Sequence, residues 1–200
     1  MSATTGTWNE TMFCSRASFT AVASSSSEAS LLAAVSPVPF TQPVIPALFF
    51  MRGGGGYGIT VILEAEGILG TTSTPTIIFQ LRLGTTNGSS YLSGTSVGVS
   101  ATITTQSGVS AVPWYLRMPI TCNQPGIGSG ALTLQGTGSV RSPAGFAAPY
   151  EYSLIPTQSS TLTATIDGSV TQYANLSITW GTSSSSNTCT CTSLRMYGIN

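Results

Sequence analysis

Short runs in which apolar and polar residues alternate one by one constrain the fold of this chain more than any other feature. In residues 76–83 (TIIFQLRL) every second side chain is apolar, while Gln80 and Arg82 occupy the opposite phase. Residues 112–122 (VPWYLRMPITC) repeat the pattern, with Trp114 in the apolar phase. Successive side chains of a β-strand point to opposite faces, so this period predicts strands with one buried and one polar face.

Six further segments have the same strand-like character, and turn-forming residues separate them. They are residues 59–66, 96–105, 131–139, 161–167, 173–180 and 188–198. About eight strands with no helical segment between them predict an all-β fold, and we expect a single antiparallel β-sandwich of jelly-roll type. A short edge strand is also expected near residues 31–35.

The N-terminal part of the chain differs from this pattern. Residues 1–23 lack a sustained period and carry isolated aromatic residues, Trp8, Phe13 and Phe19, which is typical of an extended arm that lies on its own or a neighbouring surface. Four prolines between residues 37 and 46 exclude a helix and a central strand there. The expected organisation is therefore an arm over 1–23 and a β-sandwich domain over 24–200.

The surface of such a domain would carry very little charge. Only 6% of the residues are charged, against about 25% in an ordinary soluble domain, and the net charge is zero. Polarity comes instead from serine and threonine, which supply 60 of the 200 residues. Hydroxyl groups without net charge give no colloidal repulsion, so we expect a protein that works packed against other subunits. A secreted domain with a hydroxyl-rich face is the alternative.

Several classes of function are not expected from this sequence. The arginines are dispersed and form no basic stripe for nucleic acid, and no apolar run approaches the roughly 20 residues that span a membrane. The first residues lack a secretory signal, which predicts synthesis and assembly in a cytoplasm. Without histidine or lysine a serine has no usual base, and no G-x-S-x-G motif occurs. We therefore expect no enzyme, no catalytic residues and no cofactor.

The four cysteines could indicate a metal site, a disulfide or simple packing. Cys189 and Cys191 would share one face of a strand at about 6.5–7 Å between their Cα atoms, which is too far for easy bridging. Zinc would need two further ligands, and only Cys14 and Cys122 remain, at spacings that match no zinc motif. We expect four free thiols that behave as small buried hydrophobic residues and no metal site. A bridge from Cys122 to Cys189 or Cys191 stays open.

Glu64 and Glu66 form the one close pair of acids in the sequence. On one strand they would be about 6.5–7 Å apart, which overlaps the separation of glycosidase carboxylates. Glycosidase acids normally come from different strands, so the prediction is a solvated face or ion pairs with Arg82 or Arg117 on neighbouring strands.

A likeness to a known family is carried by four segments of the chain. They are Ile45–Phe50 (IPALFF), Gly67–Thr76 (GILGTTSTPT), Gly108–Thr121 (GVSAVPWYLRMPIT) and Trp180–Cys191 (WGTSSSSNTCTC). These segments resemble the IPA-x-FF segment, the G-x-x-x-T-x-G-T-P-T turn, the GVS…W-x-L-x-x-x-I-T strand and the W…N-T-x-T-C ending of a β-rich virion protein of tailed bacteriophages. The resemblance covers roughly residues 25–200 and leaves the arm outside. Ser73 stands where the family usually has glycine.

The resemblance implies a virion structural protein. Members of the family occur as head decoration (cement) proteins and as minor tail or fibre components. We expect a capsid decoration protein on the virion surface, assembled in the host cytoplasm, which binds the lattice of the major capsid protein as a homotrimer. In that case Trp8, Phe13 and Phe19 would anchor the arm on a neighbouring subunit. The alternatives are a minor tail or fibre subunit that contacts the host surface or its glycans, and a non-viral carbohydrate-binding module.

Overall fold

The computed structural model describes residues 9–16, 18–23, 25–33, 42–51, 59–87, 92–128, 131–156 and 163–199. Within these ranges the chain forms fifteen strands and one 3-10 turn, η1 (Phe49–Met51), and no α-helix. The strands are β1 (Asn9–Ser15), β2 (Val22–Ala23), β3 (Ala29–Ser30), β4 (Val44–Ile45), β5 (Thr60–Gly70), β6 (Thr76–Gly84), β7 (Thr95–Ser100), β8 (Ile103–Thr104), β9 (Val112–Gln124), β10 (Leu132–Gly136), β11 (Gly138–Arg141), β12 (Glu151–Ile155), β13 (Thr163–Ile166), β14 (Gln172–Trp180) and β15 (Thr188–Ile199). The predicted all-β class is confirmed.

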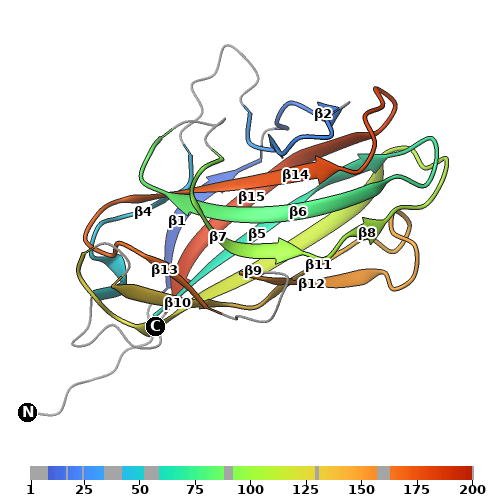
Figure 1. The fold of residues 1–200 in the computed structure, drawn as a ribbon. Coiled ribbons are helices and arrows are strands. Elements are labelled where there is room, and N and C mark those ends of the chain that lie inside the picture. Colours follow the sequence, from blue (N-terminus) through green and yellow to red (C-terminus); the bar gives the residue numbers. More distant parts are fainter. Residues whose placement is uncertain are drawn as a thin grey trace, which may run out of the picture.

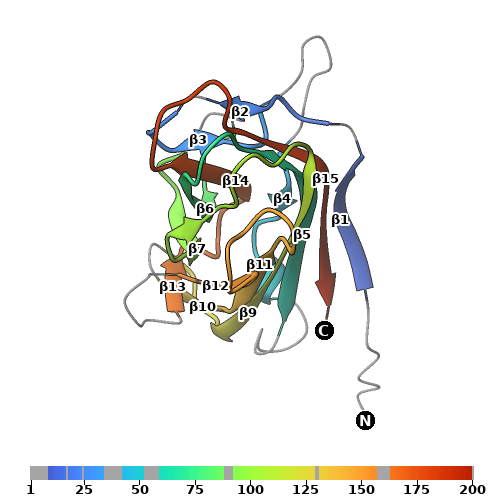
Figure 2. The same cartoon turned by 90° about the vertical axis from the view of Figure 1, so that its right-hand side faces the viewer.

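All strands of the described part belong to one antiparallel sheet that curls around a core (Figure 1). Its order is β1-β15-β5-β9-β11-β12-β7-β6-β14-β3, and β10 branches off to pair with β9 and β13. Figure 2 shows β15 and β5 along one side of the core, β6 and β7 along the other, and β9 to β12 beneath. The turned view gives the molecule the shape of a half-barrel.

The expected eight-strand sandwich is therefore wrong in its strand count and in its separation into two sheets. The segment 131–139 breaks at Thr137, so that β10 pairs with β13 while β11 pairs with β12. β11 and β12 then carry the sheet from β9 round to β7, and one continuous sheet results. Four strands of two residues each, β2, β3, β4 and β8, raise the strand count further above the expected eight. The edge strand expected near 31–35 lies slightly earlier, at β3.

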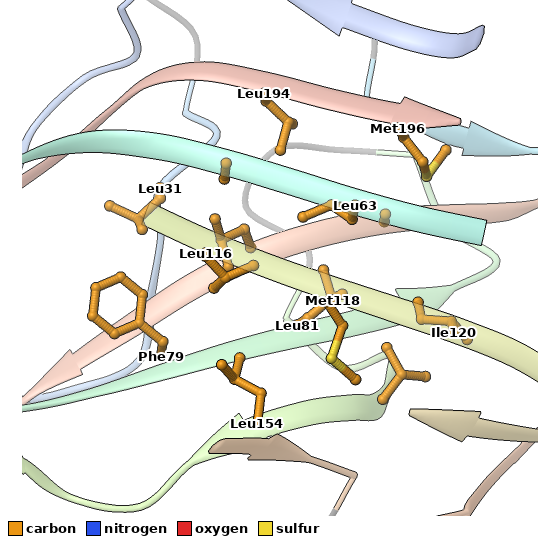
Figure 3. Close-up of a cluster of buried hydrophobic side chains, with 14 of the residues drawn as sticks. Leu31, Leu63, Phe79, Leu81, Leu116, Met118, Ile120, Leu154, Leu194 and Met196 are labelled. Carbon is orange, nitrogen blue, oxygen red and sulfur yellow. The ribbon is translucent and has the colours of Figure 1, made fainter. Parts of the chain in front are cut away.

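The alternating residues fill the core as expected (Figure 3). Phe79 and Leu81 of β6 and Leu116 and Met118 of β9 are completely buried. Burying a side chain of this size stabilises the fold by about 1.5–3 kcal/mol relative to exposure. Leu63 of β5 lies among them, so the two long sides of the sheet meet in one core.

Residues 18–23 and 25–33, here named the strap, connect the two sides of the curled sheet. At one end the backbone N–H of Phe19 donates to Cys191 of β15 (2.9 Å), and at the other end that of Leu31 donates to Leu176 of β14 (2.8 Å). Phe19 and Val22 are buried in the core. The strap thus joins β14 to β15 over a part of the core that the long strands leave open (Figure 2).

β1 extends the sheet along the edge of β15 that faces away from β5, the same edge on which β2 of the strap pairs. It pairs with β15 of the same chain from Asn9↔Ile199 to Ser15↔Leu194, with a register shift between Thr11 and Phe13. The N-terminal residues that the structure describes therefore lie on their own domain. No helix among the described residues is long and apolar enough to cross a membrane.

Candidate functional site

Six of the twelve charged residues lie in two rows on the outer face of the sheet, opposite the core. Directly opposed residues of antiparallel strands point to the same face, and one row of them contains Arg195 of β15, Glu64 of β5 and Arg117 of β9. A second row contains Glu66, Tyr115, Arg141 and Glu151, from β5, β9, β11 and β12. The rest of this face carries mainly hydroxyl and apolar side chains.

Glu64 lies at the centre of a hydrogen-bonded cluster. Its side chain is only 9% exposed, and it accepts bonds from the hydroxyls of Tyr115 (3.1 Å) and Tyr197 (3.3 Å). The Nε atoms of Arg117 (3.2 Å) and Arg195 (2.5 Å) approach its two carboxylate oxygens from the strands on either side. These five residues are named the Glu64 cluster below.

The donors keep Glu64 ionised although it is largely buried. Burial by itself would raise the pKa of Glu64, but the bonds from Tyr115 and Tyr197 and the charge of Arg195 outweigh it and hold the pKa below its usual value. Burial and the neighbouring carboxylate raise the pKa of the Tyr115 phenol, and the charge of Glu64 raises the pKa of Arg195. The cluster is therefore a fixed network of charges at neutral pH.

The two arginines of the cluster remain accessible. The side chain of Arg117 is 46% exposed and that of Arg195 is 58% exposed. Each contacts Glu64 through Nε, and within the described residues their terminal nitrogens make no hydrogen bond of their own. A planar guanidinium presents these terminal N–H groups as a fork that fits a carboxylate or phosphate.

Two open hollows flank Arg195 on this face. One, of about 360 Å³, is lined by Arg195 with Cys14, Arg16, Glu66, Thr192 and Ser193. The other, of about 460 Å³, is lined by Arg195 with Thr11, Cys14, Glu64 and Tyr197. The surface around this arginine is thus indented and polar.

The predicted ion pairs are confirmed in part. Arg117 does contact Glu64, but Arg82 contacts Glu28 of the strap instead, in a bidentate pair with Nε–Oε1 at 2.9 Å and Nη2–Oε2 at 2.8 Å. The sequence did not predict the contact of Arg195 with Glu64, because the alternation of the last strand indicates the face on which Arg195 lies but not the residue opposite it on the next strand. The register of β15 on β5 supplies that neighbour.

The predicted arm anchors lie in different places. Trp8 lies outside the described residues. Phe13 packs half-buried against the core of its own chain, and Phe19 is 5% exposed within that core. Their contact with a neighbouring subunit stays a prediction.

The four cysteines are free thiols, but they are not all buried. The expectation is wrong for Cys14, which is exposed on the edge strand β1 opposite Arg195. Cys122 forms no disulfide with Cys189 or Cys191 of the last strand. It lies beside Ile59 at one end of β5, whereas Cys189 pairs with Leu69 near the other end. No group of three or more potential metal ligands occurs among the described residues.

Comparisons with protein-family models and with curated proteins find no match to this chain.

Proposed function

We propose that this chain is a bacteriophage virion structural protein, of the capsid decoration type, that binds an assembled shell as a homotrimer. The observation that carries the proposal is that six of the only twelve charged residues of this chain lie in two neighbouring rows on one sheet face. Charged groups at a subunit contact set register and partner choice more than affinity. The hydroxyl-rich remainder of the surface can pack against neighbouring subunits without repulsion.

The mechanism of such a protein is linkage. A subunit that binds the assembled lattice but not the free shell protein stabilises the lattice by mass action. The partners under this proposal are the lattice of the major capsid protein and further copies of the same chain, and the location is the capsid surface. A three-fold lattice position would favour a trimer.

The resemblance to tailed-phage virion proteins supports the proposal, because several residues of the resembling segments pack closely in the core. Gly67 and Trp114, both in resembling segments, lie opposite each other in the β5–β9 pairing. Phe49, in another such segment, packs where a side chain at Gly198 would lie. A jelly-roll relationship belongs to the same proposal, and it is supported by long antiparallel strands on two sides of one core (Figure 2).

The experiment that tests the proposal is the copy number of this chain in purified virus particles, measured by quantitative mass spectrometry against the main shell protein. A ratio near one, or a simple fraction set by the lattice symmetry, is the expected result. A handful of copies per particle would overturn decoration in favour of a minor tail or fibre subunit. Absence from particles would overturn the virion role altogether.

A further inference from the structure

We propose that Arg117 and Arg195, held apart by Glu64, form a two-pronged recognition site for the carboxylates of an acidic protein segment. This inference rests on the proposed function, for which it names the chemistry of the partner. The partner segment is expected on the surface of the shell to which the chain binds. The occupant is thus a peptide with closely spaced aspartate or glutamate residues.

The first step of the argument is that the two guanidinium groups are fixed in place. Each Nε is bound to a different oxygen of the same Glu64 carboxylate. That carboxylate is itself held by the hydroxyls of Tyr115 and Tyr197. An arginine already ordered in this way loses less side-chain entropy when it binds a ligand.

The second step is that each arginine retains its binding fork. The carboxylate contacts use Nε, and within the described residues the terminal nitrogens of Arg117 and Arg195 have no hydrogen-bond partner. Both side chains are about half exposed. Arg82 differs, because its side chain is only 21% exposed. Its Nε and Nη2 donate to Glu28, and its Nη1 donates to the carbonyl oxygen of Gly94. Arg82 is a structural arginine, whereas Arg117 and Arg195 remain available.

The third step concerns spacing. β15 and β9 lie on either side of β5, so the Cα atoms of Arg195 and Arg117 are about 10 Å apart, two interstrand spacings. Acidic residues two positions apart on an extended peptide have Cα atoms about 6.6 Å apart on one face. The long side chains of arginine and glutamate span the difference, so one peptide can engage both forks.

The fourth step separates an acidic peptide from a nucleic acid or a sulfated glycan. Polyanions bind where several basic groups follow one another along a stripe. In the neighbouring row on the same face Glu66 and Glu151 outnumber Arg141, so a long polyanion that covers both rows is repelled, whereas a short acidic peptide can lie over Arg117 and Arg195 alone. Its own N–H donors can face the neighbouring carboxylates while its acids meet the arginines.

Fluorescence polarisation with a labelled hexaglutamate peptide tests the site on the full chain. We expect the natural sequence to bind hexaglutamate and not hexaglutamine. The double variant Arg117→Lys/Arg195→Lys keeps both charges beside Glu64 but removes the forks, and we expect it to bind at least about tenfold more weakly. Arg141→Gln removes a charge from the same face, where its guanidinium stacks on the ring of Tyr115 at 5.2 Å, and we expect less than a twofold change.

Thermal unfolding of each variant shows whether it folds. If the double variant does not fold, the single variant Arg117→Gln is tested in its place. The inference is overturned if hexaglutamate does not bind, if the lysine variant binds it equally well, or if a heparin fragment binds tighter than hexaglutamate. Sedimentation with purified shells separates the two proposals. Shell binding that the lysine variant retains would overturn the carboxylate site alone, whereas hexaglutamate binding without shell binding would overturn the proposed function and leave the site.

Discussion

Gly67 and Trp114 lie opposite each other across β5 and β9, and the indole ring of Trp114 fills the space that a side chain at position 67 would need. A Cβ atom added at Gly67 would lie 2.7 Å from Cζ2 of Trp114, and it would collide with the backbone carbonyl oxygen of Thr190. Thr190 lies just before the register shift of β15 between Cys191 and Ser193. The missing side chain therefore lets the ring and the neighbouring strand approach β5 closely.

The substitution Gly67→Ala should destabilise the fold strongly. The Thr190 oxygen belongs to the backbone of the paired strand β15, so it cannot move away without disturbing the ladder with β5. Overpacking of a tight core costs typically 1–3 kcal/mol and occasionally more, and we expect about 3 kcal/mol here. Urea denaturation measures this loss in the free energy of unfolding.

Gly108→Ala is the matched control for that experiment. Gly108 has a positive φ of 67°, and an added Cβ would meet no atom within 4 Å. Only the backbone preference is lost, which costs about 1–2 kcal/mol. If Gly67→Ala costs no more than Gly108→Ala, the close approach of Trp114 and Thr190 does not limit residue 67.

The stability of the fold should decrease at acid pH through Glu64 and Glu28. For both groups burial alone would raise the pKa, but hydrogen bonds and arginine charges outweigh it and hold the pKa below the ordinary value of 4.5. A lowered folded-state pKa contributes stability that is complete above the unfolded value and is lost as pH falls through the folded one. We expect a constant Tm between pH 5.5 and 7, within about 2 °C, and a decline below about pH 4.5.

The double variant Glu28→Gln/Glu64→Gln identifies the source of this decline. Glutamine does not titrate, so the Tm of the variant should be lower at neutral pH and should change less between about pH 4.5 and 3. Circular dichroism melts at each pH provide the comparison. An equally steep decline in the variant would assign the acid sensitivity to other carboxyl groups.

The Glu28–Arg82 pair should hold the strap on the sheet. Besides Arg82 of β6, the carboxylate of Glu28 accepts a bond from the hydroxyl of Ser177 of β14 at 2.5 Å. Replacing Glu28 by alanine leaves the guanidinium of Arg82 without its partner in a place that is only 21% exposed. We expect a loss of about 1–3 kcal/mol and faster amide hydrogen exchange in residues 25–33 than elsewhere.

Glu151→Ala serves as the control for the strap, because Glu151 is exposed on β12. It should change the free energy of unfolding by less than about 0.5 kcal/mol and leave exchange in the strap unaltered. Uniform acceleration of exchange across the whole sheet in Glu28→Ala would argue against a local function of the pair.

The burial of individual strand residues could be predicted from the sequence, while their partners could not. The alternation around Phe79 and Met118 indicates which side chains are buried, because this pattern is visible in residues only two positions apart in the sequence. The contact between Glu64 and Arg195 depends on the register of two strands far apart in the sequence, which no local pattern specifies. The contacts of Arg195 and Tyr197 with Glu64 therefore cannot be predicted from the sequence.

The strap shows a second limit of local patterns. Phe19 and Val22 lie in a segment without a clear period, and their burial follows from an opening between β14 and β15 that exists only in the folded sheet. β12 was missed for another reason, since five residues, Glu151–Ile155, give too short an alternation to separate from a turn. The curl of the sheet likewise results from pairings of β11 and β12 that the sequence does not reveal.

Deletions from the N-terminus should show how much residues 1–8 and residues 9–23 each contribute to the stability of the fold. Removing residues 1–8 leaves every described strand intact, so we expect an unchanged free energy of unfolding within about 0.5 kcal/mol. Removing residues 1–23 also deletes Phe19 and Val22 from the core, and the lost burial should cost at least about 3 kcal/mol. Urea denaturation compares the two. Equal stability of both truncated proteins would support the view that 1–23 is an independent arm.

The cysteines should differ sharply in their reactivity toward a thiol reagent such as iodoacetamide. Cys14 is exposed, whereas burial raises the pKa of Cys122, raises that of Cys189 strongly and raises that of Cys191 to about 12. The reactive species is the thiolate, whose share at pH 8 is about 10⁻⁴ for a pKa of 12. Mass spectrometry of the native protein should find one modified residue, Cys14.

The remaining thiols should react only when the chain unfolds. In Cys14→Ser the native protein should therefore stay unmodified over the same period, and urea should expose three reactive groups. Rapid modification of Cys189 or Cys191 in the native state would contradict their burial and would reopen a chemical role for the pair. Their expected part is packing, because Cys191 pairs with Gly67 and Cys189 with Leu69 on the buried side of the β15–β5 ladder.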